Sequence, residues 1–302
     1  MTGPVHELLT RSARDHPDKT ALVHGGRCAC YEDLHTLSNR FANTLLRAGL
    51  EKGDRVIIVM ENSIEQVAAY YGVLKAGLVC VEIHDRSTAA EASYCVENSG
   101  ARACIAGKSQ AARLADIDVE VMVSPGDVIG RPGRQEIAFS DVMLTPEDMP
   151  RTAVDENDTA CIVYTSGSTG RPKGVMLSHA NICSNTESIV DYLGLTPEDR
   201  VMAVLPFHYV YGKSLLNTHV CVGASVVINN RFAFPNAVIK EMVEIGVTGF
   251  AGAPSTFAIL MNRSIFPRTP VPTLRYVTQA GGAMAPALTK RLVERLGTTQ
   301  LF

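Results

Sequence analysis

The sequence predicts an α/β protein: layered βαβ subdomains in which mostly parallel sheets are flanked by helices. Continuous apolar runs such as GLVCVEI and TACIVYT are typical of strands buried on both faces. Segments with helical periodicity lie between these runs, as at residues 34–45 and 288–296. Strands that alternate with helices in this way indicate parallel sheets covered on both sides.

The first predicted subdomain, with its linker, spans residues 1–150. Its first clear helix carries Leu34, Leu37, Phe41 and Leu45 on one face and ends near Gly49. The segments that follow alternate between strand and helix: GDRVIIVM, IEQVAAYYGVLKAG, GLVCVEI, EASYCVENSG and ARACIAG. Residues 124–157 are rich in glycine, proline and acidic residues, so we interpret them as a loop-rich linker.

The second predicted subdomain spans residues 151–302. Its expected strands are TACIVYT, RVMAVLP, ASVVIN, GVTGFAG and LRYVTQAG, with helices between them. After the helix LTKRLVERLG, Leu301 and Phe302 are typical of the start of a buried strand, although a frayed terminus is the alternative. We therefore expect this subdomain to be incomplete at its C-terminal end.

Composition excludes several classes of function. Apolar residues make up 46% and charged residues 20% of the 302 residues, so a large core can form. The net charge is −3 without a basic block, which gives no support for nucleic-acid binding. The sequence shows no signal peptide and no membrane span, and its eight cysteines lie mostly in apolar runs, so we expect a cytoplasmic protein with reduced thiols.

The stretch YTSGSTGRPKGVMLSH combines hydroxyls, glycines and a lysine in a pattern suited to phosphate. It differs from a Walker loop because Gly174, and not a hydroxyl residue, follows Lys173, and because the strand-like VML follows in place of a helix. We expect a mobile loop between two strands. Lys173 would supply a compact positive charge, with further phosphate contacts from Thr165, Ser166, Gly167, Ser168, Thr169, Gly170 and Gly174. The alternative is a polar hairpin loop without a ligand.

The string YTSGSTGRPKGVMLSHANI closely resembles the signature of the AMP-forming acid ligases, the adenylate-forming superfamily. This superfamily includes acyl-CoA synthetases of fatty acid metabolism, aryl-CoA ligases, luciferases and the adenylation domains of peptide synthetases. Other segments agree in order and spacing, so that the resemblance covers nearly the whole chain: GDRVIIVMENSIEQVAAYYGVLKAG, LPFHYVYGKSLLNTH, VTGFAGAPSTFAILM and LRYVTQAGGAMAP.

The resemblance implies a reaction between ATP and a carboxylic acid that releases pyrophosphate and leaves an acyl-adenylate. Many family members then transfer the acyl group to a thiol of CoA or of a carrier protein. Lys173 is then the catalytic residue, because its ammonium would stabilise the departing pyrophosphate. Mg²⁺ is expected from the family, but its ligands cannot be identified in this chain.

Two further segments are candidates for the substrate and adenine sites. In LPFHYVYG, Tyr209 occupies the position of the family's usual histidine, His208 lies one residue earlier, and Tyr211 matches the pocket aromatic. The alternative for these rings is packing at a strand end. Gly281, Gly282 and Ala283 form the turn that the family places against adenine. Gly252 and Ala253 match a pocket-lining loop more weakly.

Several family segments have no match in these residues, including a tyrosine-glycine-x-threonine-glutamate run and a second catalytic lysine. The sequence therefore leaves two interpretations open. One is a ligase of which this chain is the N-terminal portion, including one half of a split enzyme with a separate C-terminal half. The other is a non-catalytic remnant that binds a nucleotide or an acyl ligand. No aspartate stands in PFHYVYGKS to pair with an amino group, so an acyl or aryl acid is favoured over an α-amino acid.

Overall fold

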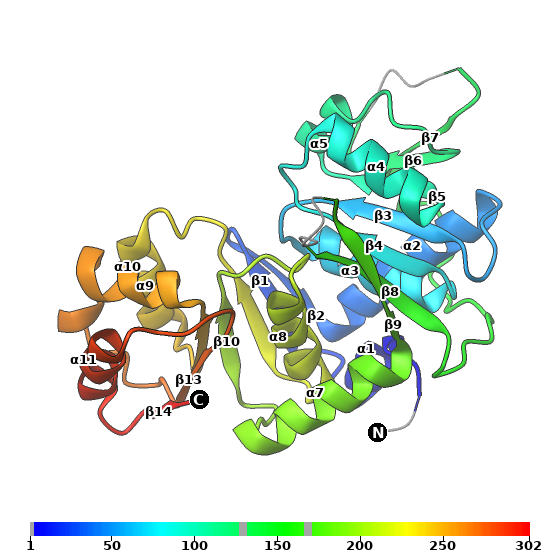
Figure 1. The fold of residues 1–302 in the computed structure, drawn as a ribbon. Helices are drawn as coiled ribbons and strands as arrows, with labels where there is room; N and C mark the ends of the chain where they lie inside the picture. The colour runs from blue at the N-terminus through cyan, green and yellow to red at the C-terminus, as the bar shows by residue number, and fades with distance from the viewer. Residues whose placement is uncertain (1–2, 127–131, 166–170) are drawn as a thin grey trace. The chain divides into compact units, whose positions relative to one another are not determined.

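The structure, a computed structural model, describes residues 3–126, 132–165 and 171–302. The chain divides into two compact units (Figure 1). Unit 1 comprises residues 1–18 and 30–187, and unit 2 comprises residues 19–29 and 188–302. The predicted boundary near residue 150 lies before β8 and β9, which pair with the sheet of unit 1.

The sheet of unit 1 has the strand order β7-β6-β5-β3-β4-β8-β9 among the described residues. All its neighbouring pairs are parallel except β8 and β9, which are antiparallel. The strands are β3 (Arg55–Val59), β4 (Val79–Glu82), β5 (Ala101–Ala106), β6 (Val121–Ser124), β7 (Gln135–Ala138), β8 (Thr159–Thr165) and β9 (Lys173–Ser178). Its parallel strands therefore end at a common edge, and the lysine loop follows one of those ends.

Helices cover both faces of this sheet (Figure 1). On one face, Cys95 and Leu114 belong to a buried cluster that also contains Ile57 of β3. On the other face, α3 contacts β3 and β4 and packs against α2. The helices of unit 1 are α1 (His6–Asp15), α2 (Tyr31–Arg47), α3 (Ile64–Lys75), α4 (Ala89–Ser99), α5 (Lys108–Arg113) and α6 (Phe139–Val142).

The interpretation of residues 124–157 as a linker is wrong in part, because β7 and α6 lie within it. Strand β7 continues the sheet by pairing Glu136 with Met122 of β6. Phe139 of α6 packs edge-on against Phe41 of α2, with ring centroids 5.5 Å apart. These long-range contacts order a segment whose polar, short strand pattern gave only a weak local signal.

The sheet of unit 2 has the order β14-β13-β12-β10-β11-β1-β2. Strand β1 comes from the N-terminal part of the chain and pairs in parallel with β11, Leu22 opposite Val226. At the other end, Leu301 pairs with Val277 of β13, so a strand does form at this position. The strands are β1 (Thr20–His24), β2 (Arg27–Cys30), β10 (Arg200–Ala203), β11 (Ser225–Ile228), β12 (Gly249–Gly252), β13 (Tyr276–Gln279) and β14 (Gln300–Leu301).

One core of unit 2 joins its later helices to the sheet. Met242, Phe257 and Leu292 come from three different helices and belong to a buried cluster with strand residues such as Phe250. The helices are α8 (Val210–Cys221), α9 (Pro235–Ile245), α10 (Pro254–Arg263), the short 3-10 helix η1 (Phe266–Arg268) and α11 (Pro286–Leu296). Helix α7 (His179–Leu193) begins in unit 1 and ends in unit 2. Among the described residues, no helix is both long enough and apolar enough to cross a membrane.

A fully buried lysine lies between α2 and α3 in unit 1. The Lys75 Nζ lies 2.7 Å from both Ser38 Oγ and Asn39 Oδ1, and it also donates to the His35 carbonyl at 3.2 Å. Burial lowers the pKa of Lys75 from 10.5 to about 7, although the charges of Glu7 and Glu32 oppose this change. The folded protein therefore releases a proton from Lys75 at a lower pH than the unfolded chain does.

This difference predicts a pH-dependent free energy of unfolding. Between the folded pKa of about 7 and the unfolded value of 10.5, the unfolded chain binds more protons. The contribution of Lys75 to the free energy of unfolding therefore rises as the pH rises through this window, by up to about 1.4 kcal/mol per pH unit. This contribution is lost as the pH falls. Urea unfolding of the parent protein and of Lys75→Met should give a difference in unfolding free energy between the two proteins that changes with pH across this window. Parallel profiles of unfolding free energy against pH in the two proteins would contradict a lowered pKa of Lys75.

Candidate functional site

The lysine loop joins β8 and β9 in unit 1. Its two ends are held together because Thr165, the last residue of β8, lies opposite Lys173, the first residue of β9. Both residues are exposed. A Walker loop would lead directly into a helix, whereas Lys173 begins a six-residue antiparallel strand. This topology disfavours a P-loop kinase or ATPase. The predicted phosphate-binding residues Ser166, Gly167, Ser168, Thr169 and Gly170 lie outside the described residues.

Gly174 has a steric role beside the lysine. It lies opposite Tyr164 in the ladder, and a Cβ atom at this position would come within 2.8 Å of Ile162 Cγ2 and 3.5 Å of the Tyr164 ring. Such a contact to the Ile162 methyl is shorter than packed carbon atoms normally allow. Glycine therefore lets β9 run close to β8 at the point where Lys173 leaves the loop.

A second group of predicted residues lies in unit 2, at the carboxyl ends of β12 and β13. These strands are parallel neighbours, with Gly252 opposite Gln279. The turns that follow them come together: the Cβ position of Gly281 is 4.0 Å from Ala253 Cβ, and that of Gly282 is 3.8 Å from Pro254 Cγ. Ligands in α/β sheets bind outside the carboxyl ends of the strands, so this is a suitable place for a substrate.

The glycine turn after β13 has a defined backbone. Gly281 and Gly282 have φ values of 83° and 154°, which residues with a Cβ rarely adopt. The Gln279 Nε2 donates to the carbonyl of Gly282 at 2.9 Å, which closes the turn. Ala283 is exposed next to them. The turn therefore exposes backbone atoms and no side chain larger than the methyl group of Ala283. A flat ring needs such a surface to pack against the backbone.

Tyr211 belongs to the same group in unit 2. It lies in the first turn of α8, and its hydroxyl is 2.7 Å from Thr278 Oγ1 in β13. Burial raises the pKa of Tyr211 to about 12, partly offset by hydrogen bonds from Thr278 and the Gly252 backbone. The phenol therefore stays neutral at physiological pH. Sequence reasoning did not assign Thr278, whose only signal was a polar residue near the end of an apolar strand.

His208 and Tyr209 precede α8. Their rings lie 4.6 Å apart, and 59% of Tyr209 is exposed. Tyr209 is the N-cap residue of α8, with an extended backbone. Tyr211, in the same segment, is tied to β13 by its hydrogen bond to Thr278.

The family resemblance implies Mg²⁺, which is held by carboxylate oxygens together with substrate phosphates. Within residues 3–126, 132–165 and 171–302, no group of three or more histidine, cysteine, aspartate or glutamate side chains is arranged to hold a metal ion.

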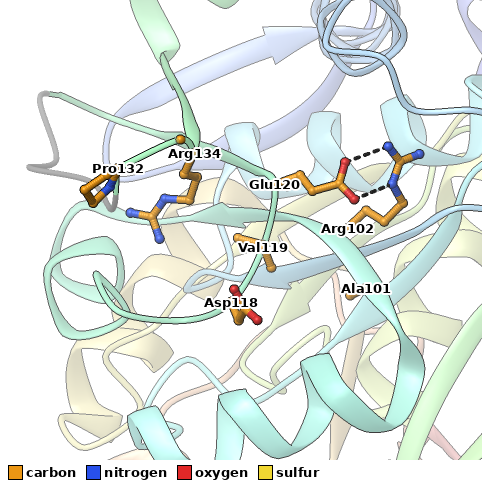
Figure 2. A pocket seen from close by; sticks show the side chains of 8 residues that line it. Ala101, Arg102, Asp118, Val119, Glu120, Pro132 and Arg134 are labelled. Carbon is orange, nitrogen blue, oxygen red and sulfur yellow. Dashed lines mark hydrogen bonds and ion pairs between the residues drawn. The ribbon is translucent and has the colours of Figure 1, made fainter.

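A cavity of about 390 Å³ in unit 1 lies at the opposite edge of the sheet from the lysine loop. It is lined by residues at the amino ends of β5, β6 and β7, including Arg102, Glu120 and Arg134 (Figure 2). Arg102 and Glu120 form a two-bond ion pair there, at 2.9 and 2.6 Å. This cavity brings together none of the predicted site residues.

Comparison with known proteins now decides the family, because residues 9–302 match the AMP-binding enzyme family. The chain belongs to this family. It is 28% identical over 284 residues to the 3-hydroxybenzoate–CoA ligase of Aromatoleum sp. (strain CIB), covering 93% of this chain and 54% of that protein. It is 29% identical over 263 residues to the long-chain-fatty-acid–CoA ligase FadD13 of Mycobacterium tuberculosis (strain ATCC 25618 / H37Rv), covering 86% and 51%. The chain thus spans about half the length of these relatives.

A solved structure from another protein has the same fold. The inhibitor-bound N-terminal domain of FACL13 from Mycobacterium tuberculosis superposes with a TM-score of 0.86 at 26% identity. The superposition covers 98% of this chain and 74% of that one. The predicted fold, sheets flanked by helices as in the large N-terminal domain of AMP-forming ligases, is therefore confirmed.

Proposed function

We propose that the protein activates an acyl or aryl carboxylic acid with ATP, releases pyrophosphate and passes the acyl group to CoA or a carrier thiol. Family membership supports acid adenylation in general, and the names of the two relatives pair CoA with an aryl acid and with a fatty acid. The observation that carries the proposal is the exposed Lys173 at the end of a strand hairpin within the family signature.

The adenylation step needs alignment of the reactants and stabilisation of charge more than it needs proton transfer. A carboxylate oxygen attacks the α-phosphorus of ATP, a new P–O bond forms, and the bond to the β-phosphate oxygen breaks. The electron pair of that bond leaves with pyrophosphate, so no side chain has to accept a proton. The Lys173 ammonium supplies positive charge where negative charge develops on the leaving group.

The acid and the adenine ring have a different requirement, namely a neutral and shaped surface. Tyr211, Gly252 and Ala253 would line the acid site, with His208 and Tyr209 nearby in sequence. Gly281, Gly282 and Ala283 would lie against adenine, because their turn leaves the backbone uncovered. Thr278 would hold the Tyr211 phenol in one orientation.

Exchange of labelled pyrophosphate into ATP, measured with a panel of aryl and fatty acids, tests this function. We expect acid-dependent exchange from an extended form, in which the 302 residues are followed by the C-terminal half of the Aromatoleum relative. We expect little exchange from the 302 residues alone, since the family's threonine–glutamate segment and second lysine have no match in them.

A binding measurement supplements this assay. The 302 residues alone should bind a non-hydrolysable acyl-adenylate analogue, as judged by calorimetry. Binding without exchange in the extended form would favour the non-catalytic ligand-binding alternative. Absence of both binding and exchange would contradict the proposed function, and strong exchange by the 302 residues alone would contradict the expected need for further segments.

A further inference from the structure

Helix α4 contacts the lysine loop directly. The hydroxyl of Tyr94, on this helix, donates to the carbonyl oxygen of Pro172 at 2.9 Å. Pro172 immediately precedes Lys173 and has no N–H group, so it cannot donate to the ladder between β8 and β9. The Tyr94 hydroxyl thus provides a fixed hydrogen bond next to the lysine, from an element far away in sequence.

The other strand of the hairpin is bonded to the same helix. The hydroxyl of Tyr164, in β8, donates to Asn98 Oδ1 at 2.8 Å. Burial raises the pKa of Tyr164 to about 12, so the hydroxyl remains a donor at neutral pH. The rings of Tyr94 and Tyr164 pack edge-to-face with centroids 6.3 Å apart. Strand β8 and the residue that precedes β9 are therefore each tied to α4 by a hydrogen bond of a tyrosine hydroxyl.

Helix α4 is itself well anchored. Its N-cap Thr88 and Glu91 form a capping box, with the Thr88 Oγ1 accepting from the Glu91 N–H at 3.2 Å. Gly100 ends the helix with a left-handed backbone at φ 64°. Between these ends, Cys95 and Val96 belong to the buried core of the sheet. A helix fixed at both ends and along one face can hold a loop in place.

We propose that Tyr94 is a positioning residue for Lys173, and that α4 holds Pro172 and Lys173, at the start of β9, in place before the nucleotide binds. This inference rests on the proposed function, because it assigns Tyr94 to the same phosphate-binding loop. A lysine that is held in place beforehand loses less conformational freedom on binding, so the nucleotide binds more tightly.

The test compares the 302-residue parent with Tyr94→Phe, which removes one hydroxyl and keeps the ring. Tyr192→Phe is the matched control, because Tyr192 is 56% exposed and lies in the part of α7 that belongs to unit 2. Calorimetry with MgATP gives the affinity, and amide hydrogen exchange reports on the order of the hairpin. Loss of one such hydrogen bond predicts about three- to tenfold weaker ATP binding. The Lys173 and Gly174 amides should exchange faster in Tyr94→Phe alone.

Other results would overturn the inference. An unchanged ATP affinity of Tyr94→Phe would overturn it, whether or not the amides of the hairpin exchange faster. Faster exchange throughout unit 1 would show that Tyr94 supports the fold in general and does not position the loop. If the parent protein binds no ATP, the proposed function fails. Amide hydrogen exchange of Lys173 and Gly174 still shows in that case whether Tyr94 positions Lys173.

Discussion

Replacing Lys173 with alanine should slow acid-dependent pyrophosphate exchange by about a hundredfold in the extended form. The lysine is exposed at the first position of β9, so its removal leaves the hairpin ladder intact. It also removes a full positive charge from the place where the leaving group gains negative charge. Loss of one preorganised group of this kind typically costs about 10²–10³ in rate. The exchange rate at saturating acid is the quantity to measure.

Two further variants make this prediction specific. Lys240→Ala removes a lysine from the exposed face of α9 and should leave the exchange rate unchanged. Tyr211→Ala should mainly raise the KM for the acid and affect pyrophosphate less, because Tyr211 lies with the turns after β12 and β13. If Lys173→Ala and Tyr211→Ala each impaired the use of acid and of pyrophosphate equally, this division of roles would be wrong.

The variant Gly72→Ala should destabilise the protein by about 3 kcal/mol. Gly72 lies inside α3 where this helix meets α2, and an added Cβ would be 2.6 Å from Phe41 Cβ and 2.8 Å from the Ser38 carbonyl oxygen. The α2 backbone cannot yield without separating the two helices, and overpacking of this kind costs about 1–3 kcal/mol or more. Urea unfolding and the melting temperature both measure the effect.

The sign of this result is informative by itself. In an exposed helix, alanine is more favourable than glycine by about 0.5–1 kcal/mol, because it restricts the unfolded backbone. Ala237→Gly, at an exposed position of α9, calibrates this propensity in the same protein. A Gly72→Ala variant that is as stable as the parent would mean that α2 and α3 do not approach this closely.

Local sequence signals were sufficient for most of the elements and for the lysine loop. The apolar run VML after Lys173 predicted a strand there, and β9 contains it. TACIVYT coincides with β8, and HANICSNTESIVDYL coincides with α7. These segments have strong patterns, so their neighbours in space were not needed to recognise them.

The features that were not predicted depend on contacts between distant parts of the chain. Strand β7 has a polar, exposed pattern, and it becomes a strand through its pairing with β6. The hydrogen bond from Tyr94 to Pro172 joins residues 78 positions apart, and that between Tyr211 and Thr278 joins residues 67 positions apart. No local periodicity reports such pairs, because each partner is an ordinary residue in its own segment.

The insertion of β1 into the sheet of unit 2 affects the order in which the protein can fold. Its partner β11 is about two hundred residues later in the chain, and Lys19 beside β1 also donates to the carbonyl of Gly223 at 2.6 Å. During synthesis on the ribosome, β1 therefore cannot pair with β11 until most of unit 1 has been made. The high contact order of this pairing makes it a late and slow step. A cut at a single peptide bond cannot release unit 2 as an intact sheet.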